Sequence, residues 1–177
     1  MPVLPFVNTR QRQFEALVRA HSGELYRYAY WLCGQAALAE DLVQETLLRA
    51  WKGLEALREA EAARGWLYTI LRREHARLYE RVRPGLDELD EEQHAAEMAW
   101  SDPERQGSDA ELRAAMLALP PKYREPLLMQ VLGGYSCEEI ADELGIKSNA
   151  VMVQLFRARQ KLKEALSERS ETNHGLS

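Results

Sequence analysis

Arginine side chains recur at helical spacing in the first half of the chain, where they could neutralise an anionic surface. Arg73, Arg77 and Arg81 lie four residues apart, and Arg72 adjoins the first of them. Residues four apart share one face of an α-helix, so this spacing predicts a basic stripe. Local charge on one face is what matters for binding nucleic acid. The stripe therefore predicts a contact surface for phosphates.

Groups that could catalyse a reaction or bind a metal are sparse. His75 adjoins Glu74, but neighbouring helix positions point to different sides. The sequence has no nucleophile elbow, GxxxxGK loop or HExxH motif, and its cysteines and histidines lack metal-ligand spacing. We expect no enzymatic activity, cofactor, metal or small-molecule substrate. Cys33 and Cys137 are predicted to be reduced, partly buried thiols, with a redox switch as the alternative.

The composition is that of a globular protein with an acidic middle. The chain has 177 residues, of which 46% are hydrophobic and 29% charged, and its net charge is −5. No apolar run approaches the roughly 20 residues of a membrane helix, and no signal peptide is apparent, so a cytoplasmic location is expected. Prolines, glycines and an acidic run predict a flexible linker over residues 83–108, with a short helical turn at 94–100.

Apolar residues recur at helical spacing on both sides of this linker. They predict helices from about residue 12 to Gly34, from Ala37 past Trp51 and from Gly65 to Val82, and others at 112–119 and from Pro121 to Gly133. Pro126 is expected to bend that last helix or shift its start. The predicted fold is all-α, with two small helical domains. The predicted divisions are a flexible N-terminus (1–11), a domain (12–82), the linker (83–108), a domain (109–167) and a flexible tail (168–177).

The strongest local pattern lies near the C-terminus. Ser136 and Glu139 fit a capping box, Gly145 fits a left-handed helix end, and Ser148 can cap a following helix. The inner face of that helix is predicted to consist of Val151, Leu155, Ala158, Leu162 and Leu166. Two helices joined by a tight glycine turn, the second basic and amphipathic, predict a helix-turn-helix. The alternative is a plain helical hairpin with a solvated basic face.

The outward face of this second helix is predicted to enter the major groove of DNA. Its apolar side chains would contact thymine methyl groups, and its basic side chains would reach phosphates. The predicted DNA-contacting residues are Ser148, Asn149, Met152, Val153, Gln154, Phe156, Arg157, Arg159 and Lys161.

Motifs in both predicted domains resemble those of the sigma-70 family of sigma factors. Residues 134–141 (GYSCEEIA) and 156–159 (FRAR) resemble the fourth conserved region, and residues 40–46 (EDLVQET) with 49–51 (RAW) resemble the second. Two such regions in this order, without the third, resemble the extracytoplasmic-function (ECF) class over about residues 12–166. The resemblance implies a subunit that directs core RNA polymerase to promoters and helps to open them.

The resemblance also implies which surfaces bind which partners. In such proteins one helix docks on the β′ clamp helices of polymerase, and the following helix and loop bind the minus-ten element with one base flipped out. The C-terminal domain binds the β flap and the minus-thirty-five element, here through the nine residues named above. The implied polymerase-binding residues are Asp41, Gln44, Glu45, Leu48 and Arg49. The implied minus-ten residues are Arg72, Arg73, Arg77, Tyr79 and Arg81.

Leu48 is singled out by its position as well as by the resemblance. It lies opposite the apolar residues Val43 and Leu47, among charged side chains, as expected of a small interface anchor. An ordinary solvated face is the alternative. An anti-sigma factor, often membrane-linked, is a further implied partner.

The recognition helix departs from many relatives. Residues 151–154 are Val, Met, Val and Gln, where relatives carry a small hydroxyl residue followed by basic ones, so no promoter sequence can be transferred. Two other functions stay open. One is a stand-alone helix-turn-helix regulator. The other is a sigma mimic that sequesters an anti-sigma factor, which the departure favours and the arginine stripe opposes.

Overall fold

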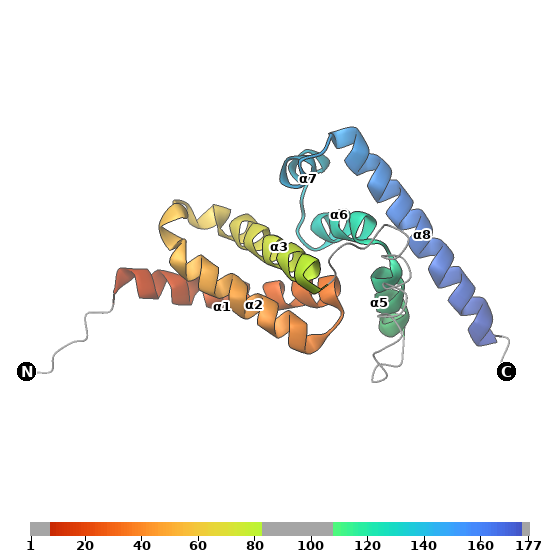
Figure 1. Ribbon diagram of the computed structural model, residues 1–177, viewed down its shortest axis with the longest axis horizontal. Coiled ribbons are helices and arrows are strands. Elements are labelled where there is room, and N and C mark those ends of the chain that lie inside the picture. Colours follow the sequence, from red (N-terminus) through yellow and green to blue (C-terminus); the bar gives the residue numbers. More distant parts are fainter. Residues whose placement is uncertain (1–7, 83–107, 175–177) are drawn as a thin grey trace, which may run out of the picture.

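The computed structural model describes residues 8–82 and 108–174, and within these ranges its regular structure is entirely helical. Helices α1 (Thr9–Cys33), α2 (Ala36–Lys52) and α3 (Ala63–Val82) form an N-terminal unit (Figure 1). Helices α5 (Ser108–Ala118), α6 (Pro121–Val131), α7 (Cys137–Leu144) and α8 (Ser148–His174) form a C-terminal unit. Two single 3₁₀ turns, Leu54–Ala56 and Ala60–Ala62, connect α2 to α3. The prediction of an all-α fold is confirmed. The linker and its predicted helical turn lie almost wholly outside the described residues.

Several helix ends differ from the predicted boundaries. Helix α1 begins at Thr9, inside the segment predicted to be flexible, because the Asn8 side chain accepts a hydrogen bond from the Arg10 amide (3.1 Å). Its end was predicted correctly, since Gly34 adopts the left-handed conformation with φ 73°. Helix α6 begins at Pro121 as predicted, and Pro126 lies within it without shifting that start.

Helix α8 extends to His174, seven residues beyond the predicted end of the second domain. Hydroxyl side chains in this last part donate to carbonyl oxygens four residues earlier: Ser167 to Lys163 (2.9 Å), Ser170 to Leu166 (3.0 Å) and Thr172 to Glu168 (2.9 Å). Serine and threonine are compatible with a helix as well as with a loop, because their hydroxyl groups can donate to backbone carbonyls inside a helix. Residues 168–174 therefore continue α8 where the sequence predicted a tail.

The two units pack against each other. A single cluster of buried apolar residues runs from Tyr28 and Leu67 in the N-terminal unit to Tyr123 and Val151 in the C-terminal unit. At Gly34, a Cβ atom would lie 2.5 Å from Cδ1 of Leu117, so the end of α1 approaches α5 closely. This contact between the units was not predicted from the sequence.

Candidate nucleic-acid interface

The helix-turn-helix forms as predicted, by local hydrogen bonds. The Glu139 amide donates to the Ser136 hydroxyl (3.1 Å), and the Ser136 amide donates to the Glu139 carboxylate (2.7 Å), which completes the capping box. Gly145 ends α7 in the left-handed conformation with φ 67°. Ser148 is the first residue of α8 and not its cap, because the Val151 amide bonds to the carbonyl of Lys147 (3.1 Å).

The outward face at the start of α8 is strongly apolar. Met152, Val153 and Phe156 are 51%, 50% and 67% exposed, whereas Val151 and Leu155 are buried against the C-terminal unit. Asn149 and Arg157 are exposed on the same turns. Gln154 is half-buried, and its Oε1 atom is buried without a hydrogen-bond partner. Large exposed apolar side chains of this kind on a small protein indicate a contact surface.

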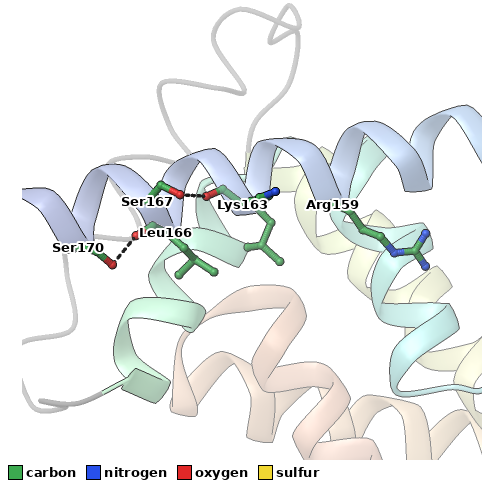
Figure 2. Close-up of a pocket in the computed structure, with 6 residues that line it drawn as sticks. Arg159, Lys163, Leu166, Ser167 and Ser170 are labelled. Carbon is green, nitrogen blue, oxygen red and sulfur yellow. Dashed lines mark hydrogen bonds between the residues drawn. The ribbon is translucent and has the colours of Figure 1, made fainter.

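Some of the basic residues further along α8 contact side chains of α6. Arg159 donates to the Gln130 side chain on α6, and the Lys161 ammonium lies 5.8 Å from the centre of the Tyr123 ring. An open groove of about 440 Å³ runs along this part of α8 (Figure 2). Its lining residues are Arg159, Leu162, Lys163, Leu166, Ser167 and Ser170. The groove is therefore lined by two cations, Arg159 and Lys163, beside apolar side chains.

Helix α2 presents the predicted polymerase-binding residues on its outward side. Leu48 is 55% exposed, while Val43 is buried and Leu47 is half-buried beneath it. Asp41 and Gln44 are exposed, and Glu45 pairs with Arg49 at 3.2 Å. Arg49 also pairs with Glu74 of α3, which is buried. The exposure of Leu48 among polar side chains agrees with the interface anchor that the sequence predicts.

The arginine stripe of α3 is divided among several environments. Arg73, Arg77 and Arg81 are exposed, and Arg77 also donates to Glu74 at 2.8 Å. Tyr79 is half-buried, with its ring centre 6.4 Å from that of His75. Arg73 and Arg81 therefore present their charge directly to solvent.

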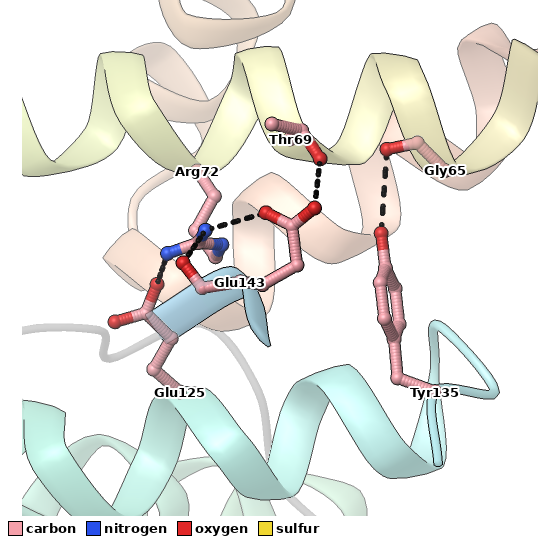
Figure 3. A network of polar contacts seen from close by, with 6 residues as sticks. All are labelled: Gly65, Thr69, Arg72, Glu125, Tyr135 and Glu143. Carbon is pink, nitrogen blue, oxygen red and sulfur yellow. Dashed lines mark hydrogen bonds and ion pairs between the residues drawn. The ribbon is translucent and has the colours of Figure 1, made fainter. Parts of the chain in front are cut away.

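Arg72 is the residue of this stripe that reaches the C-terminal unit (Figure 3). Its guanidinium donates to Glu125 of α6 (3.2 Å) and to both the carboxylate (2.9 Å) and the carbonyl oxygen (3.0 Å) of Glu143 of α7. The Thr69 hydroxyl, one turn earlier on α3, also donates to the Glu143 carboxylate (3.0 Å). We refer to Thr69, Arg72, Glu125 and Glu143 as the Arg72 cluster. Sequence reasoning placed Arg72 on DNA and missed these partners.

The electrostatics of the Arg72 cluster follow from two carboxylates sharing one guanidinium. Burial alone would lower the pKa of Arg72, but the Glu125 and Glu143 carboxylates outweigh burial and raise it. Burial raises the pKa of the Glu125 carboxyl, and Arg72 offsets only part of that shift. Arg72 is thus held in its charged form by the two carboxylates.

Several other side chains of the two units are buried or half-buried. Trp66 is half-buried and packs on the core, and Leu54 and Leu57 of the α2–α3 connection are buried against Leu17 and Ala63. Burial and the Arg124 charge lower the pKa of His75 to about 4. Cys33 is buried and Cys137 is partly buried, and both are free thiols.

The described ranges offer neither a metal centre nor a membrane span. Residues 8–82 and 108–174 place no group of three or more His, Cys, Asp or Glu side chains where they could hold a metal ion. Over the same ranges, no helix combines the length and apolar character of a bilayer span.

Family models match both units of the chain. The model of sigma-70 region 2 matches residues 17–83, and that of sigma-70 region 4 matches residues 109–162. Two solved structures share the fold. Sigma factor RpoE in complex with the anti-sigma factor NepR, from Bartonella quintana, is 22% identical with a TM-score of 0.63, covering 89% of this chain and 96% of that one. CnrH in complex with the cytosolic domain of CnrY is 27% identical with a TM-score of 0.62, covering 89% and 90%.

Two relatives with similar sequences are both described as ECF RNA polymerase sigma factors. The ECF RNA polymerase sigma factor SigL of Mycobacterium tuberculosis is 36% identical over 157 residues, which cover 86% of this chain and 88% of SigL. The ECF RNA polymerase sigma factor SigE of Mycolicibacterium smegmatis is 33% identical over 165 residues, which cover 89% of this chain but only 63% of SigE. With both regions matched in order, the chain belongs to the sigma-70 family, among the ECF RNA polymerase sigma factors.

Proposed function

We propose that this chain directs core RNA polymerase to specific promoters and helps to open them, with each unit performing a separate task. The N-terminal unit, residues 12–82, binds the polymerase clamp through the outward face of α2 and the minus-ten element through α3. The C-terminal unit, residues 109–167, binds the polymerase flap and reads the minus-thirty-five element with α8. Chemistry stays with the polymerase, and the chain works in the cytoplasm.

The observation that carries this proposal is that each of the two regions matched by a family model has an exposed face with apolar side chains. Leu48 is 55% exposed on the region 2 helix α2, and Met152, Val153 and Phe156 are at least half exposed on the region 4 helix α8. A protein that needed only DNA would have no use for the first face. Both faces together support a protein that joins polymerase to DNA.

An anti-sigma factor is a further proposed partner. Two neighbours with the same fold, RpoE and CnrH, are described in complex with such proteins, NepR and the cytosolic domain of CnrY. That the anti-sigma factor of this chain is membrane-linked is an expectation that rests on the family resemblance alone.

In vitro transcription tests the proposal. The purified chain is added to core polymerase on a library of promoter fragments, and start sites are mapped. Specific starts that need both the chain and core polymerase are expected. Specific duplex binding by the chain alone, with no starts, would instead identify a stand-alone helix-turn-helix regulator. Release of a partner sigma factor from its inhibitor, without DNA binding, would identify a sigma mimic.

A further inference from the structure

Glu74 is a buried carboxylate on the helix that carries the arginine stripe. Its neighbours Arg73 and Arg77 are exposed, whereas Glu74 itself is buried. A carboxylate is costly to bury unless cations or hydrogen-bond donors compensate its charge. Two arginines do so here, Arg49 of α2 and Arg77 of α3. The proposed function gives Glu74 no task of its own, although it connects two helices with different tasks.

Both arginines contact the same oxygen of Glu74. Its Oε1 atom lies 2.5 Å from Nε of Arg49 and accepts a hydrogen bond from Nη1 of Arg77 (2.8 Å). Arg77 is three residues further along α3, so that bond stays within one helix. The ion pair with Arg49 instead joins α3 to α2. Glu74 is therefore the group on α3 that fixes the side chain of Arg49.

Arg49 has a second acidic neighbour, which holds it more weakly. Glu45, one turn earlier on α2, lies 3.2 Å from the same Nε atom. The side chains of Arg49 and Glu45 are 43% and 46% exposed, and water screens a pair of this kind. The side chain of Glu74 is only 9% exposed, so its attraction for Arg49 is screened less. Glu74 therefore sets the position of Arg49 more than Glu45 does.

The position of Glu74 is itself fixed by the core. Leu71 lies three residues earlier on the same face of α3 and is fully buried. It belongs to the same apolar cluster as Leu42 and Val43 of α2. The packing of α2 against α3 thus places the Glu74 carboxylate at a fixed point beside Arg49.

Arg49 is placed where it can take part in the polymerase-binding face. It directly follows Leu48, the exposed apolar side chain of that face. Both carboxylates approach Nε, the guanidinium nitrogen nearest to the backbone, while the terminal nitrogens form the outer end of a partly exposed side chain. A guanidinium has five N–H donors in a fixed plane, so one that is held at Nε can still donate to a partner. A side chain ordered in advance also loses less entropy when the partner binds.

We propose that Glu74 is a positioning residue for polymerase binding, which lies on α3 but acts through Arg49 of α2 by holding its guanidinium beside Leu48. This inference rests on the proposed function, because it needs the α2 face to bind core polymerase. It gives a buried residue of the promoter-binding helix a part in polymerase binding.

Titration of core polymerase with the full chain, without DNA, tests this role. Glu74→Gln keeps the size of the side chain and removes its charge, and it should weaken binding by roughly three- to tenfold because Arg49 loses its fixed position. Arg49→Ala should weaken binding at least as much. In an Arg49→Ala background, Glu74→Gln should have no further effect, since no guanidinium is left to position. A purely structural role would instead lower the affinity equally in both backgrounds.

Two control variants separate positioning from a change of charge. Glu80 is exposed on α3, three residues after Arg77, just as Glu74 is three residues before it. Glu80→Gln makes the same change of charge and should leave the affinity unchanged. Arg77→Ala removes the other partner of Glu74 and should also bind core polymerase as the wild type does. Circular dichroism establishes that each variant keeps its helices. If Glu74→Gln does not, Glu74→Asp takes its place, since it withdraws the carboxylate by one methylene and should weaken binding in the same way.

The outcomes distinguish the positioning role from the polymerase face itself. Wild-type affinity in Glu74→Gln or in Arg49→Ala would overturn the positioning role, as would equal losses in Glu74→Gln and Glu80→Gln. An equal loss from Glu74→Gln with and without Arg49 would overturn it too. Wild-type affinity in both Leu48→Asp and Arg49→Ala would overturn the proposed polymerase-binding face of α2.

Discussion

Helices α8 and α3 carry the two proposed DNA-binding faces, and they present them in different states. The face of α8 is open, with Met152, Val153 and Phe156 each at least half exposed. On α3, Arg72 is bonded to the C-terminal unit and Arg77 to Glu74. The α8 face is exposed throughout, whereas the α3 face combines the paired Arg72 and Arg77 with the exposed Arg73 and Arg81. The two faces are therefore expected to contribute differently, α8 by apolar contact and α3 by charge.

The largest effect is expected from a change that touches neither DNA face. Leu48→Asp should weaken binding to core polymerase by about thirtyfold or more, because it puts a charge at the apolar anchor of the α2 face. A pull-down with core polymerase measures it. Leu48→Met, which keeps the apolar contact, is the control. Undiminished binding by Leu48→Asp would leave α8 and α3 as the functional surfaces of a different class of protein.

The buried side of α3 is expected to make the protein sensitive to acid. His75 has a pKa of about 4 in the folded chain, against 6.5 for the unfolded chain, because of burial and the Arg124 charge. The unfolded chain therefore takes up the proton first, and stability is lost as pH falls from about 6.5 towards 4, by at most about 1.4 kcal/mol per pH unit.

Urea unfolding at pH 7 and pH 5 measures this loss of stability. His75→Gln should make the free energy of unfolding fall less over that interval than it does in the wild type. The same pH dependence in both proteins would show that His75 is not the group responsible.

The exposed side of α3 is expected to contribute through counterion release. Arg73→Ala with Arg77→Ala should lower the salt dependence of promoter binding by about one unit for each phosphate that is no longer neutralised. Of the single variants, Arg73→Ala should cost more, because Arg77 is already paired with Glu74. Binding of holoenzyme to promoter fragments across a salt series measures both. An unchanged slope in the double variant would remove these arginines from the interface.

The smallest expected effect sharpens the description of α8. Replacing thymine by uracil in the minus-thirty-five element removes one methyl group and keeps every hydrogen bond. If the exposed apolar face reads methyl groups, each effective replacement should weaken binding by about fourfold. Phe156→Ala should bind less tightly and lose that sensitivity. Equal affinity for thymine and uracil at every position would show that α8 reads its site through polar side chains alone.

Features that depend on neighbouring residues could be predicted from the sequence, whereas contacts between residues far apart in the chain could not. The helix-turn-helix was predictable because Ser136, Glu139 and Gly145 fix their own helix ends through bonds within a few residues. The exposure of Leu48 was likewise predictable from helical periodicity. The beginning of α1 and the end of α8 were missed, since short polar side chains at those places suit either a loop or a helix.

The Arg72 cluster could not be predicted from the sequence. Arg72 is 53 residues from Glu125 and 71 from Glu143 in the chain, and no local pattern relates them. An arginine on a helix face is equally suited to a phosphate or a carboxylate, so its residue type does not distinguish the two partners. Only the folded structure, which brings Arg72 within hydrogen-bond distance of α6 and α7, does so.

Gly34 ends α1 and also lies directly against α5. Its positive φ would strain any residue with a side chain, and a Cβ atom there would also meet Leu117 of α5. A glycine at this position is thus required twice, and the two requirements can be separated genetically. Leu117→Ala would relieve the collision but would also leave a cavity, because Leu117 is buried. The difference in stability between the Gly34→Ala, Leu117→Ala double variant and Leu117→Ala alone would therefore measure the backbone strain.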